Sequence, residues 1–339
     1  MPSSWQRFSD FLEGPAAADR VRRVFDAADQ FIVERAVTLE QRRLIGAPVA
    51  RLRAEITADA ERASMCLFVH LPVLVYAGLR GEERPAIPLA SATTLLFAGL
   101  DLFDDVADGD WPGSAAGSNT AEANLAAATL LCAFPQLMVG ELAAPPQLIA
   151  AIGSTLARGL LRMSAGQQQD LSAQGADEVR SCEIEATAIA KSGEEAALFA
   201  CMAAQLAEAP EEIAGKYEEL GRSIGAGAQL ASDCHELFED PAARDLVHGA
   251  RTLPIVLHLE RLLGAERTAF LALLDDARTE AAAREEVRLR LRSGGSLRRC
   301  AFIVETYRQR ALRLCREAAP LEPARGCLEA LIGSISFFP

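Results

Sequence analysis

An apolar run becomes acidic within about two helical turns in the segment Leu95-Leu-Phe-Ala-Gly-Leu-Asp-Leu-Phe-Asp-Asp-Val-Ala-Asp-Gly-Asp110. Residues three and four apart lie on the same face of a helix. This spacing predicts one shared face for the carboxylates of Asp101, Asp104, Asp105 and Asp108. Like charges placed in this way repel one another, more strongly when they are partly buried, so a cation is expected beside them.

The expected cation is a hard one, because every candidate ligand is an oxygen. The cluster contains no His or Cys that would favour zinc, and it lacks the central glycine and closing glutamate of an EF-hand loop. Mg²⁺ held jointly with phosphate oxygens therefore fits better than Ca²⁺. A solvated helix end at which acids gather would give the same residues, although less readily directly after the apolar stretch 95–100.

A second acidic stripe lies in Gln229-Leu-Ala-Ser-Asp-Cys-His-Glu-Leu-Phe-Glu-Asp240. Its polar residues step by three or four positions: Gln229, Ser232, Asp233, Glu236 and Asp240. Small residues at 221–228 precede it and allow close helix packing. Two such stripes on separate apolar helices can face each other across a bundle and hold Mg²⁺ ions that clamp a diphosphate. Plain surface charges explain Glu236 and Glu239 equally well, and His235 is expected to be a neighbour rather than a ligand.

The whole sequence predicts one large all-α domain over residues 1–339, with residues 1–15 as a lead-in. Hydrophobic residues make up 50% of the 339 residues, helix formers dominate, and strand signals are nearly absent. Breakers such as Gly46-Ala-Pro48 recur every ~20 to 30 residues and divide the chain into about ten to twelve helices. The segments 86–103, 124–142 and 146–162 are apolar nearly all round, which predicts that they are buried.

Charge and cysteine spacing exclude several function classes. The 34 basic and 47 acidic residues give a net charge of −13, which argues against a nucleic-acid binder. The eight cysteines form no C-x-x-C pair, so neither a zinc ribbon nor a disulfide scaffold is expected. We expect a cytoplasmic protein with no signal peptide and no membrane span, because the apolar stretches are short or interrupted, as at Pro135.

Together, the two stripes resemble the aspartate-rich motifs of the trans-polyprenyl diphosphate synthases. Asp104-Asp-Val-Ala-Asp108 is similar to their first motif, D-D-x-x-D, and Ser232-Asp-Cys-His-Glu236 to the second, with Gln229 three residues before it. Three further elements occur in the family's order: Gly166-Gln-Gln-Gln-Asp170, Lys191-Ser-Gly193 and Asp245-Leu-Val-His-Gly-Ala-Arg-Thr-Leu-Pro254. The resemblance implies the isoprenoid-synthase fold, a bundle of mostly antiparallel helices around a central apolar cavity, and a homodimer.

The resemblance also implies the site residues. Two or three Mg²⁺ ions would be bound by Asp104, Asp105, Asp108, Ser232, Asp233, Glu236 and Asp240. An allylic substrate such as geranyl, farnesyl or geranylgeranyl diphosphate would have its diphosphate bound by Lys191, Gln229 and Arg251. The implied catalytic residues are Asp104, Asp105, Lys191 and Asp233. Mg²⁺ would act as a Lewis acid that takes up charge as the allylic C–O bond breaks.

The sequence departs from the family where chain-elongating members bind isopentenyl diphosphate. Two arginines follow the first motif in those members, whereas this chain has Asp110-Trp-Pro-Gly-Ser114. The upstream element G-G-K-R-x-R-P is matched only by Arg80-Gly-Glu-Glu-Arg84-Pro85, and the lysine of G-K-x-T-L-P is Ala250, with Arg251 beside it. Transfer of a prenyl group to an acceptor is therefore the predicted reaction, with the acceptor left open. Pheromone-prenylating enzymes are a similar divergent branch.

Two other functions stay open. A class I terpene cyclase is the first, since Ser232, Glu236 and Asp240 have the spacing, although not the identities, of the cyclase motif N-x-x-x-S/T-x-x-x-E. An inactive partner subunit or a plain helical interaction protein is the second, although both stripes keep most of their oxygen ligands. Aromatic residues could serve the site, but core packing or a solvated helix face explains them more simply: Phe97, Phe103, Phe134 and, with Arg308, Tyr307.

Overall fold

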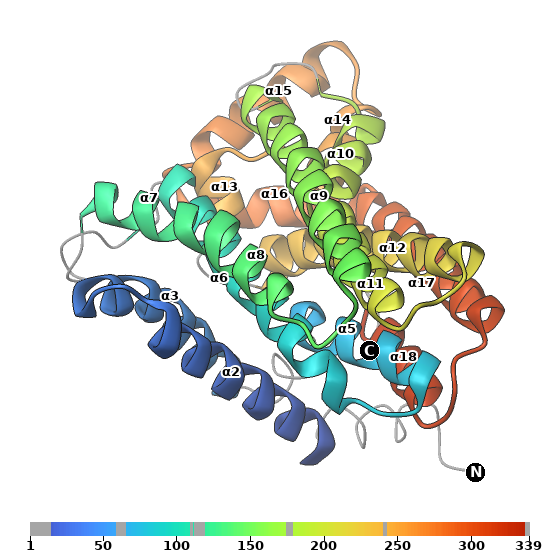
Figure 1. Cartoon of the computed structure of the whole chain (residues 1–339). Helices are drawn as coiled ribbons and strands as arrows, with labels where there is room; N and C mark the ends of the chain where they lie inside the picture. The colour runs from blue at the N-terminus through green and yellow to red at the C-terminus, as the bar shows by residue number, and fades with distance from the viewer. Residues whose placement is uncertain are drawn as a thin grey trace. The chain divides into compact units, whose positions relative to one another are not determined.

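The computed structural model describes residues 15–58, 66–108, 111, 119–173, 179–239 and 243–335 (Figure 1). All regular structure in these residues is helical, with no strand among them, which confirms the predicted all-α class. The chain divides into two compact units, each assembled from three stretches. Unit 1 comprises residues 1–158, 198–218 and 315–334, and unit 2 comprises residues 159–197, 219–314 and 335–339. The single domain stays a prediction.

The helices fall into three groups. Those of unit 1 are α2 (Pro15–Arg35), α3 (Leu39–Thr57), α5 (Leu67–Arg80), η1 (Arg84–Ala86), α6 (Ile87–Asp108), α7 (Thr120–Ala128), η3 (Thr129–Ala133), α8 (Phe134–Gly140) and α18 (Ala324–Gly333). Those of unit 2 are α10 (Ser181–Ala188), η4 (Ile189–Gly193), α13 (Arg244–His248), α14 (Leu253–Leu259), α15 (Gly264–Ala277) and α16 (Ala281–Ser293). Four helices have residues in both units: α9 (Pro146–Ala173), α11 (Glu194–Leu206), α12 (Glu211–Glu239) and α17 (Ser296–Ala318).

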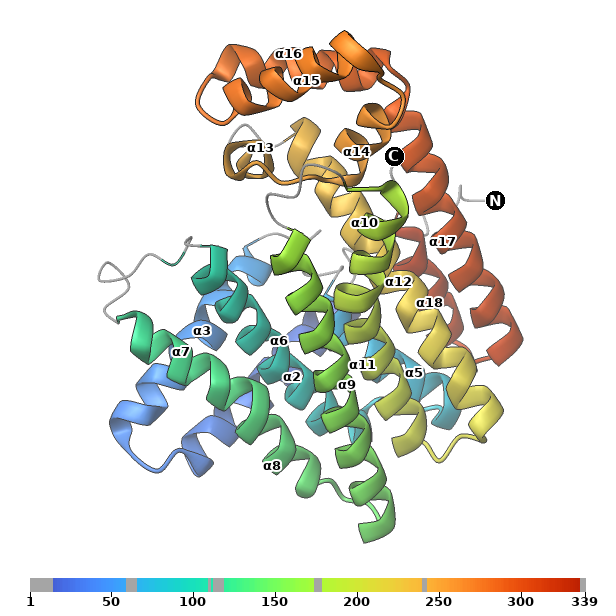
Figure 2. The ribbon, with the colours of Figure 1, turned by 90° about the horizontal axis from the view of Figure 1, so that it is seen from above.

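Helix α6 forms the centre of unit 1. It contacts α2, α3, α5, α7 and α8, which surround it in Figure 2. Its apolar side chains, such as Leu95 and Leu102, are fully buried, as predicted for a helix that is apolar nearly all round. Its buried hydroxyls are satisfied by neighbouring helices: Ser91 Oγ donates to the Val24 carbonyl at 2.9 Å, and Thr93 Oγ1 to the Phe68 carbonyl at 2.6 Å. These bonds fix α6 against α2 and α5.

Two predicted breaks do not interrupt their helices. Gly46-Ala-Pro48 lies inside α3, where Pro48 is buried, so packing outweighs the lost backbone hydrogen bond. In the stretch 120–140, the π-helical turn η3 precedes Pro135, which then occupies the first turn of α8, where proline is tolerated. The chain therefore stays helical from Thr120 to Gly140.

Two helical stretches are long and apolar enough to cross a membrane by length and composition, so the expectation that the apolar stretches are too short or interrupted was wrong; the absence of a membrane span stays a prediction. Residues 84–107 have a mean hydropathy of 1.6 and residues 120–140 one of 1.4. Their most apolar windows are 67% and 44% buried within the protein, respectively. The first stretch is buried as a core helix is, whereas more than half of the second apolar window lies on the surface of unit 1.

Unit 2 has a core of its own, formed by α12 and the helices that follow it. Its buried side chains include Leu237, Phe238, Leu246, Ile255, Phe270, Leu274, Val287 and Leu291. The helices α15 and α16 form a hairpin, drawn in orange in Figure 2, that contacts α13 and α14. A Cβ atom at Gly227 would lie 3.2 Å from Tyr307 Cβ, which shows how closely α12 packs against α17.

Glycines let α12 approach η4 and α11. A Cβ atom would lie 1.9 Å from the Ser192 carbonyl oxygen at Gly225, and 2.3 Å from the Ala196 carbonyl oxygen at Gly221. Neither distance is possible for a real side chain, so both positions require glycine. The expectation that small residues before the second stripe allow close packing is confirmed, and the contact holds Ser192 against α12.

Candidate active site

The acidic residues of both stripes lie at the C-terminal ends of long helices. Asp104 and Asp105 lie in the last turn or two of α6, as Asp233 and Glu236 do on α12. Neither helix has a basic residue in its last turn. The C-terminal end of a helix carries partial negative charge, so carboxylates there are unfavourable unless a cation offsets them. The arrangement therefore indicates a cation at each helix end.

In unit 1 the cation beside the first stripe is Arg51 of α3. Its Nη1 lies 2.7 Å from Asp105 Oδ2, and its Nη2 lies 2.8 Å from Asp101 Oδ2. The guanidinium also lies 5.7 Å from the ring centroid of Trp111. Solvent still reaches this cluster, because the side chains of Arg51, Asp101 and Asp105 are 32%, 34% and 29% exposed.

Burial and charge act in opposite directions on this cluster. Burial raises the pKa of Asp101, the Arg51 guanidinium opposes that rise, and the neighbouring Asp105 carboxylate adds to it. Burial lowers the pKa of Arg51, but the carboxylates of Asp105 and Asp101 outweigh it and raise the pKa above its ordinary value. Arg51 therefore stays charged, and Asp101 is the carboxyl group that burial disfavours as an anion.

The first stripe fits a metal that arrives together with phosphate. Asp104 is half-buried on the same helix, and Asp108 is the last residue of α6, with its side chain outside the described part of the chain. Among the described residues, no three His, Cys, Asp or Glu side chains form a group that could hold a metal alone. Mg²⁺ usually binds one or two carboxylates and completes its shell with phosphate and water oxygens, which the pair Asp104–Asp105 permits.

In unit 2 a chain of hydrogen bonds joins Lys191-Ser-Gly193 to the second stripe. Ser192 Oγ donates to Gln229 Oε1 at 2.7 Å, and Gln229 Nε2 donates to Asp233 Oδ1 at 2.7 Å. These bonds fix which end of the Gln229 amide faces Asp233. The half-buried Lys191 lies in η4, a π-helical turn of the kind often found at functional sites. Unit 2 thus brings together two of the predicted site elements, Lys191-Ser-Gly193 and the second stripe.

The remaining candidates of the second stripe differ in their surroundings. Glu236 Oε1 accepts the backbone N–H of Asp245 at 3.2 Å and lies 3.8 Å from Arg244 Nε, so it also holds the start of α13. Ser232 is exposed, and Asp240 lies outside the described residues. Arg251 is half-buried in the turn between α13 and α14.

The polyprenyl synthetase family model matches residues 50–289, a span that contains both stripes. The chain belongs to this family. It is accordingly a prenyl-transfer enzyme, and neither a terpene cyclase nor an inactive partner subunit is favoured. A search among curated proteins finds no match.

Solved structures of the same fold cover nearly the whole chain. The geranylgeranyl pyrophosphate synthetase from Pyrococcus horikoshii Ot3 is 19% identical, with a TM-score of 0.80 over 98% of this chain and 99% of that chain. The synthetase of the same kind from the archaeon Geoglobus acetivorans is 22% identical, with a TM-score of 0.78 over 94% and 98%. At these identities the likeness shows the isoprenoid-synthase fold.

One match to the family motifs is wrong. The stretch Arg80–Pro85 lies at the opposite end of α6 from Asp104, because about 20 helical residues span about 30 Å. Arg80 pairs with Glu208 at 3.2 Å, and Glu83 accepts hydrogen bonds from arginines of α2 at 2.7 Å. This stretch joins helices within unit 1 and does not serve the acidic site.

One of the three candidate phenylalanines, Phe134, packs in the core of unit 1, and Phe97 is half-buried. The Phe97 ring stacks on Phe68 with centroids 4.1 Å apart, and Phe134, which is buried, meets Phe31 edge-on at 6.0 Å. Phe103, one residue before the first motif, is 38% exposed. Core packing therefore accounts for Phe134, and Phe97 stacks on the buried Phe68 while it remains half-buried.

Glu185 of α10, a half-buried acid, was not among the residues predicted from the sequence. Tyr307 O–H of α17 lies 3.5 Å from Glu185 Oε2 of α10. Burial raises the pKa of Glu185 against the opposing effect of Tyr307, and burial together with Glu185 raises the pKa of Tyr307 to about 12. Arg308 instead pairs with Glu305 of its own helix at 2.6 Å, which fits a solvated helix face. No local pattern marks Glu185, since its partner is 122 residues away.

Proposed function

We propose that the two acidic stripes bind the Mg²⁺ ions and the diphosphate of one allylic prenyl diphosphate. The observation that carries the proposal is the placement of oxygen-only ligands at the C-terminal ends of α6 and α12 in a polyprenyl synthetase. The proposed ligands of two or three ions are Asp104, Asp105 and Asp108 on α6, Ser232, Asp233 and Glu236 near the end of α12, and Asp240, which lies outside the described residues.

The diphosphate is bound by Lys191, Gln229 and Arg251. Lys191 and Arg251 donate charge-assisted hydrogen bonds to the leaving diphosphate. Gln229, which Ser192 orients, holds Asp233 in position. The bound Mg²⁺ supplies Lewis-acid stabilisation of the charge that develops on the diphosphate. Asp104, Asp105, Lys191 and Asp233 are therefore the proposed catalytic residues.

The proposed substrate is geranyl, farnesyl or geranylgeranyl diphosphate. Support comes from a related fold: the geranylgeranyl pyrophosphate synthase from Corynebacterium glutamicum has been solved with isoprenyl diphosphate and magnesium. Trp111 stands in the stretch where chain-elongating members have arginines, and the lysine of G-K-x-T-L-P is Ala250. Both departures weaken a site for isopentenyl diphosphate, so we propose an acceptor of another kind.

Product analysis tests this function. The enzyme is incubated with Mg²⁺ and each allylic diphosphate, with and without isopentenyl diphosphate. We expect diphosphate release that requires Mg²⁺ and an added acceptor. Longer prenyl diphosphates formed with isopentenyl diphosphate would establish elongation instead, and cyclic hydrocarbons formed without any acceptor would establish a cyclase. Intact substrate in every mixture would contradict the proposal.

Charge-removing variants test the assigned residues. Asp104→Asn and Asp233→Asn should each lower kcat by about 100-fold. Each variant removes a carboxylate that binds the Mg²⁺ ions, and these ions stabilise the negative charge that develops on the leaving diphosphate. Asp276→Asn is the matched control, since Asp276 is an exposed acid in the last turn of α15, outside both stripes. Near-normal turnover by Asp104→Asn or Asp233→Asn would show the metal assignment to be wrong.

We also propose a homodimer that covers the surface of α7, η3 and α8. Leu125 and Leu137 are 60% and 47% exposed on this apolar stretch, and burial of such a surface favours association.

A cytoplasmic location of the enzyme is also proposed. Cell fractionation should recover the enzyme in the soluble fraction, and recovery in washed membranes would contradict that location.

A further inference from the structure

Arg51 makes contacts that the proposed reaction does not explain. It lies on α3, which carries none of the proposed site residues. Its Nη1 is 2.7 Å from Asp105 Oδ2 and its Nη2 is 2.8 Å from Asp101 Oδ2. Asp105 is also a proposed ligand of Mg²⁺. The guanidinium therefore occupies a carboxylate oxygen that the metal needs.

The guanidinium divides its donors between two carboxylates. Two parallel N–H···O bonds to a single carboxylate would be the stronger arrangement. Here each carboxylate receives one bond, and the buried Arg51 Nε has no hydrogen-bond acceptor, since Glu55 Oε1 lies 3.9 Å away. About a third of each side chain in the pair is also exposed. Such a pair opens readily, because exposed ion pairs add little net stability.

Trp111 provides the guanidinium with a second contact. Its ring centroid lies 5.7 Å from Arg51 Cζ, and its backbone N–H donates to the Asp105 carbonyl at 3.0 Å. A cation near the face of an indole ring is attracted by it. Arg51 can therefore release the Asp105 carboxylate and still keep contacts with Trp111 and Asp101.

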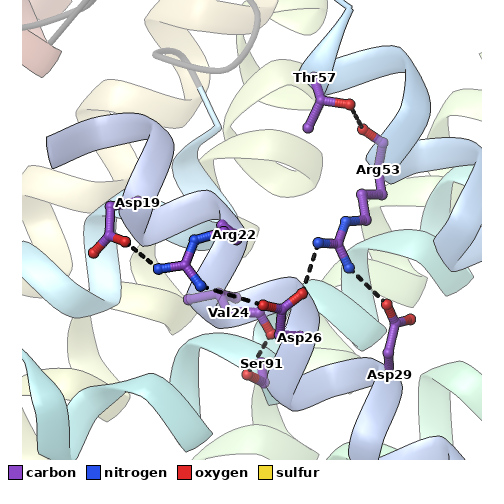
Figure 3. Close-up of polar contacts among 8 residues, drawn as sticks. All are labelled: Asp19, Arg22, Val24, Asp26, Asp29, Arg53, Thr57 and Ser91. Atoms are coloured by element: carbon purple, nitrogen blue, oxygen red, sulfur yellow. Dashed lines mark hydrogen bonds and ion pairs between the residues drawn. The ribbon is translucent and has the colours of Figure 1, made fainter. Parts of the chain in front are cut away.

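Arg53, two residues further along α3, makes the same kind of contact with acids of α2 instead of α6 (Figure 3). Its Nη2 lies 2.6 Å from Asp26 Oδ1 and its Nη1 lies 2.8 Å from Asp29 Oδ2, both on α2. Its guanidinium is 5.9 Å from the centroid of the Phe25 ring. Arg53 is thus a matched control for Arg51, because it lies on the same helix and forms ion pairs of the same kind with different carboxylates.

We propose that Arg51 is the counter-cation of the first acidic stripe in the metal-free enzyme and that it competes with Mg²⁺ for Asp105. The inference rests on the proposed function, because it takes Asp105 to be a metal ligand. Mg²⁺ carries two charges against one on Arg51, so the ion displaces the guanidinium from Asp105 while Asp101 retains it. Arg51 is a positioning residue that acts through Asp105 and sets the metal concentration at which the site fills.

Binding of Mn²⁺, followed by the electron paramagnetic resonance signal of the free ion, tests the competition without turnover. Arg51→Gln should bind Mn²⁺ at the first stripe about fivefold more tightly than the unmodified enzyme, because the positive charge that competes with the ion for Asp105 is removed. Arg53→Gln should bind like the unmodified enzyme. Asp104→Asn, combined with each variant, identifies the Mn²⁺ bound at the first stripe.

The melting temperature gives a second readout. Arg51→Gln should melt below the unmodified enzyme without metal, because Asp101 and Asp105 then repel each other. Addition of Mg²⁺ with inorganic diphosphate should raise its melting temperature by more than it raises that of Arg53→Gln. A rise that is equal in the two variants would contradict the competition.

The outcomes separate the inference from the proposed function. Equal Mn²⁺ affinity in Arg51→Gln and Arg53→Gln, or weaker binding in Arg51→Gln, overturns the competition and leaves the proposed function standing. No Mn²⁺ at the first stripe of the unmodified enzyme overturns both. Should Arg51→Gln fail to fold, Arg51→Met and Arg53→Met give the same decision, since methionine keeps an unbranched side chain and removes the charge; only Arg51→Met should then bind Mn²⁺ more tightly.

Discussion

Glu194 shows how single side chains stabilise unit 2 beside the site. It is 9% exposed and accepts hydrogen bonds from Arg162 Nε at 2.6 Å and from Arg222 Nε at 2.7 Å. Burial raises the pKa of Glu194, but the two arginines outweigh it and lower the pKa below its ordinary value of 4.5. Glu194 follows Gly193 directly, so these ion pairs anchor the end of η4, the turn that carries Lys191.

Glu194→Gln should destabilise the enzyme by about 2 kcal/mol at pH 7, because it leaves two arginines without their shared anion. A carboxyl group with a lowered pKa contributes stability above pH 4.5 and loses it as the pH falls through the lowered value. The difference between Glu194→Gln and the unmodified enzyme should therefore shrink below pH 4.5. Urea unfolding at pH 7 and pH 4 measures it, and an equal difference at both values would contradict the assignment.

Ser192 tests the hydrogen-bond chain to the second stripe. Ser192→Ala removes the donor to Gln229 Oε1, so the amide is free to turn away from Asp233. We expect KM for the prenyl diphosphate to rise by about tenfold, as for the loss of an indirect contact to a metal ligand. Ser223→Ala is the control, because this buried hydroxyl of α12 donates to the Glu219 carbonyl of its own helix at 2.9 Å. Equal KM values in the two variants would show that the chain has no role in binding.

At the residue scale, the sequence reveals neighbours on one helix and little else. The spacing of Asp101, Asp104 and Asp105 predicted their shared face because a helix repeats every 3.6 residues. Arg51 could not be assigned in this way, since it meets Asp101 across 50 residues of chain. The contact of Ser192 with Gln229 across 37 residues likewise could not be predicted from spacing, although both residues lie in segments that resemble the family's motifs.

The contact of α12 with η4 is the element-scale feature on which the second half of the site depends. Gly225→Ala should destabilise the enzyme by about 2 kcal/mol or more, because its Cβ would overlap the Ser192 carbonyl oxygen and push the helices apart. Gly215→Ala, on the same helix, meets nothing within 4 Å and should stabilise it by about 0.5–1 kcal/mol. Denaturant unfolding distinguishes them, and a shift of the same sign in both variants would contradict the close approach.

Periodicity predicted the long helices but not how they deviate from ideal geometry. The apolar segment around Leu95 is buried as expected, whereas the segment 146–162 is not: Leu156 is buried, but most of its residues are exposed or half-buried and Leu161 is 70% exposed. The π-helical turns η3 and η4 were not predicted, because an added backbone residue leaves no mark on composition. Pro48 was expected to end a helix and does not, since its burial in unit 1 outweighs the local preference.

At the scale of the whole molecule, the exposed apolar surface of α7, η3 and α8 predicts association. Leu125→Glu should convert the proposed dimer to a monomer, because a charge in a buried apolar interface is unfavourable. Phe302→Glu is the control, since Phe302 is 74% exposed on α17, outside that surface. Light scattering after size-exclusion chromatography gives the mass, and an unchanged mass for Leu125→Glu would exclude this interface.

The all-α fold class and the family could be predicted from the sequence, because they depend on local patterns and on motifs in a fixed order. Asp104-Asp-Val-Ala-Asp108 and the second stripe lie inside the matched span 50–289, in the expected order. The assignment of Arg80–Pro85 to a family motif was wrong, because a short motif carries no information on where a helix begins. Most of the length of α6 separates that stretch from Asp104. Motif order therefore indicated the family more reliably than any single motif indicated a contact.

The melting temperature with Mg²⁺ and a non-ionisable thio analogue of farnesyl diphosphate tests most directly whether both stripes hold one ligand. At about 100 times its Kd the analogue should stabilise the unmodified enzyme by about 2.7 kcal/mol, a rise of about 5 °C. Asp104→Asn and Asp233→Asn should each lose most of that rise, although they alter different helices. A full rise in either variant, or none in the unmodified enzyme, would contradict the shared magnesium–diphosphate site.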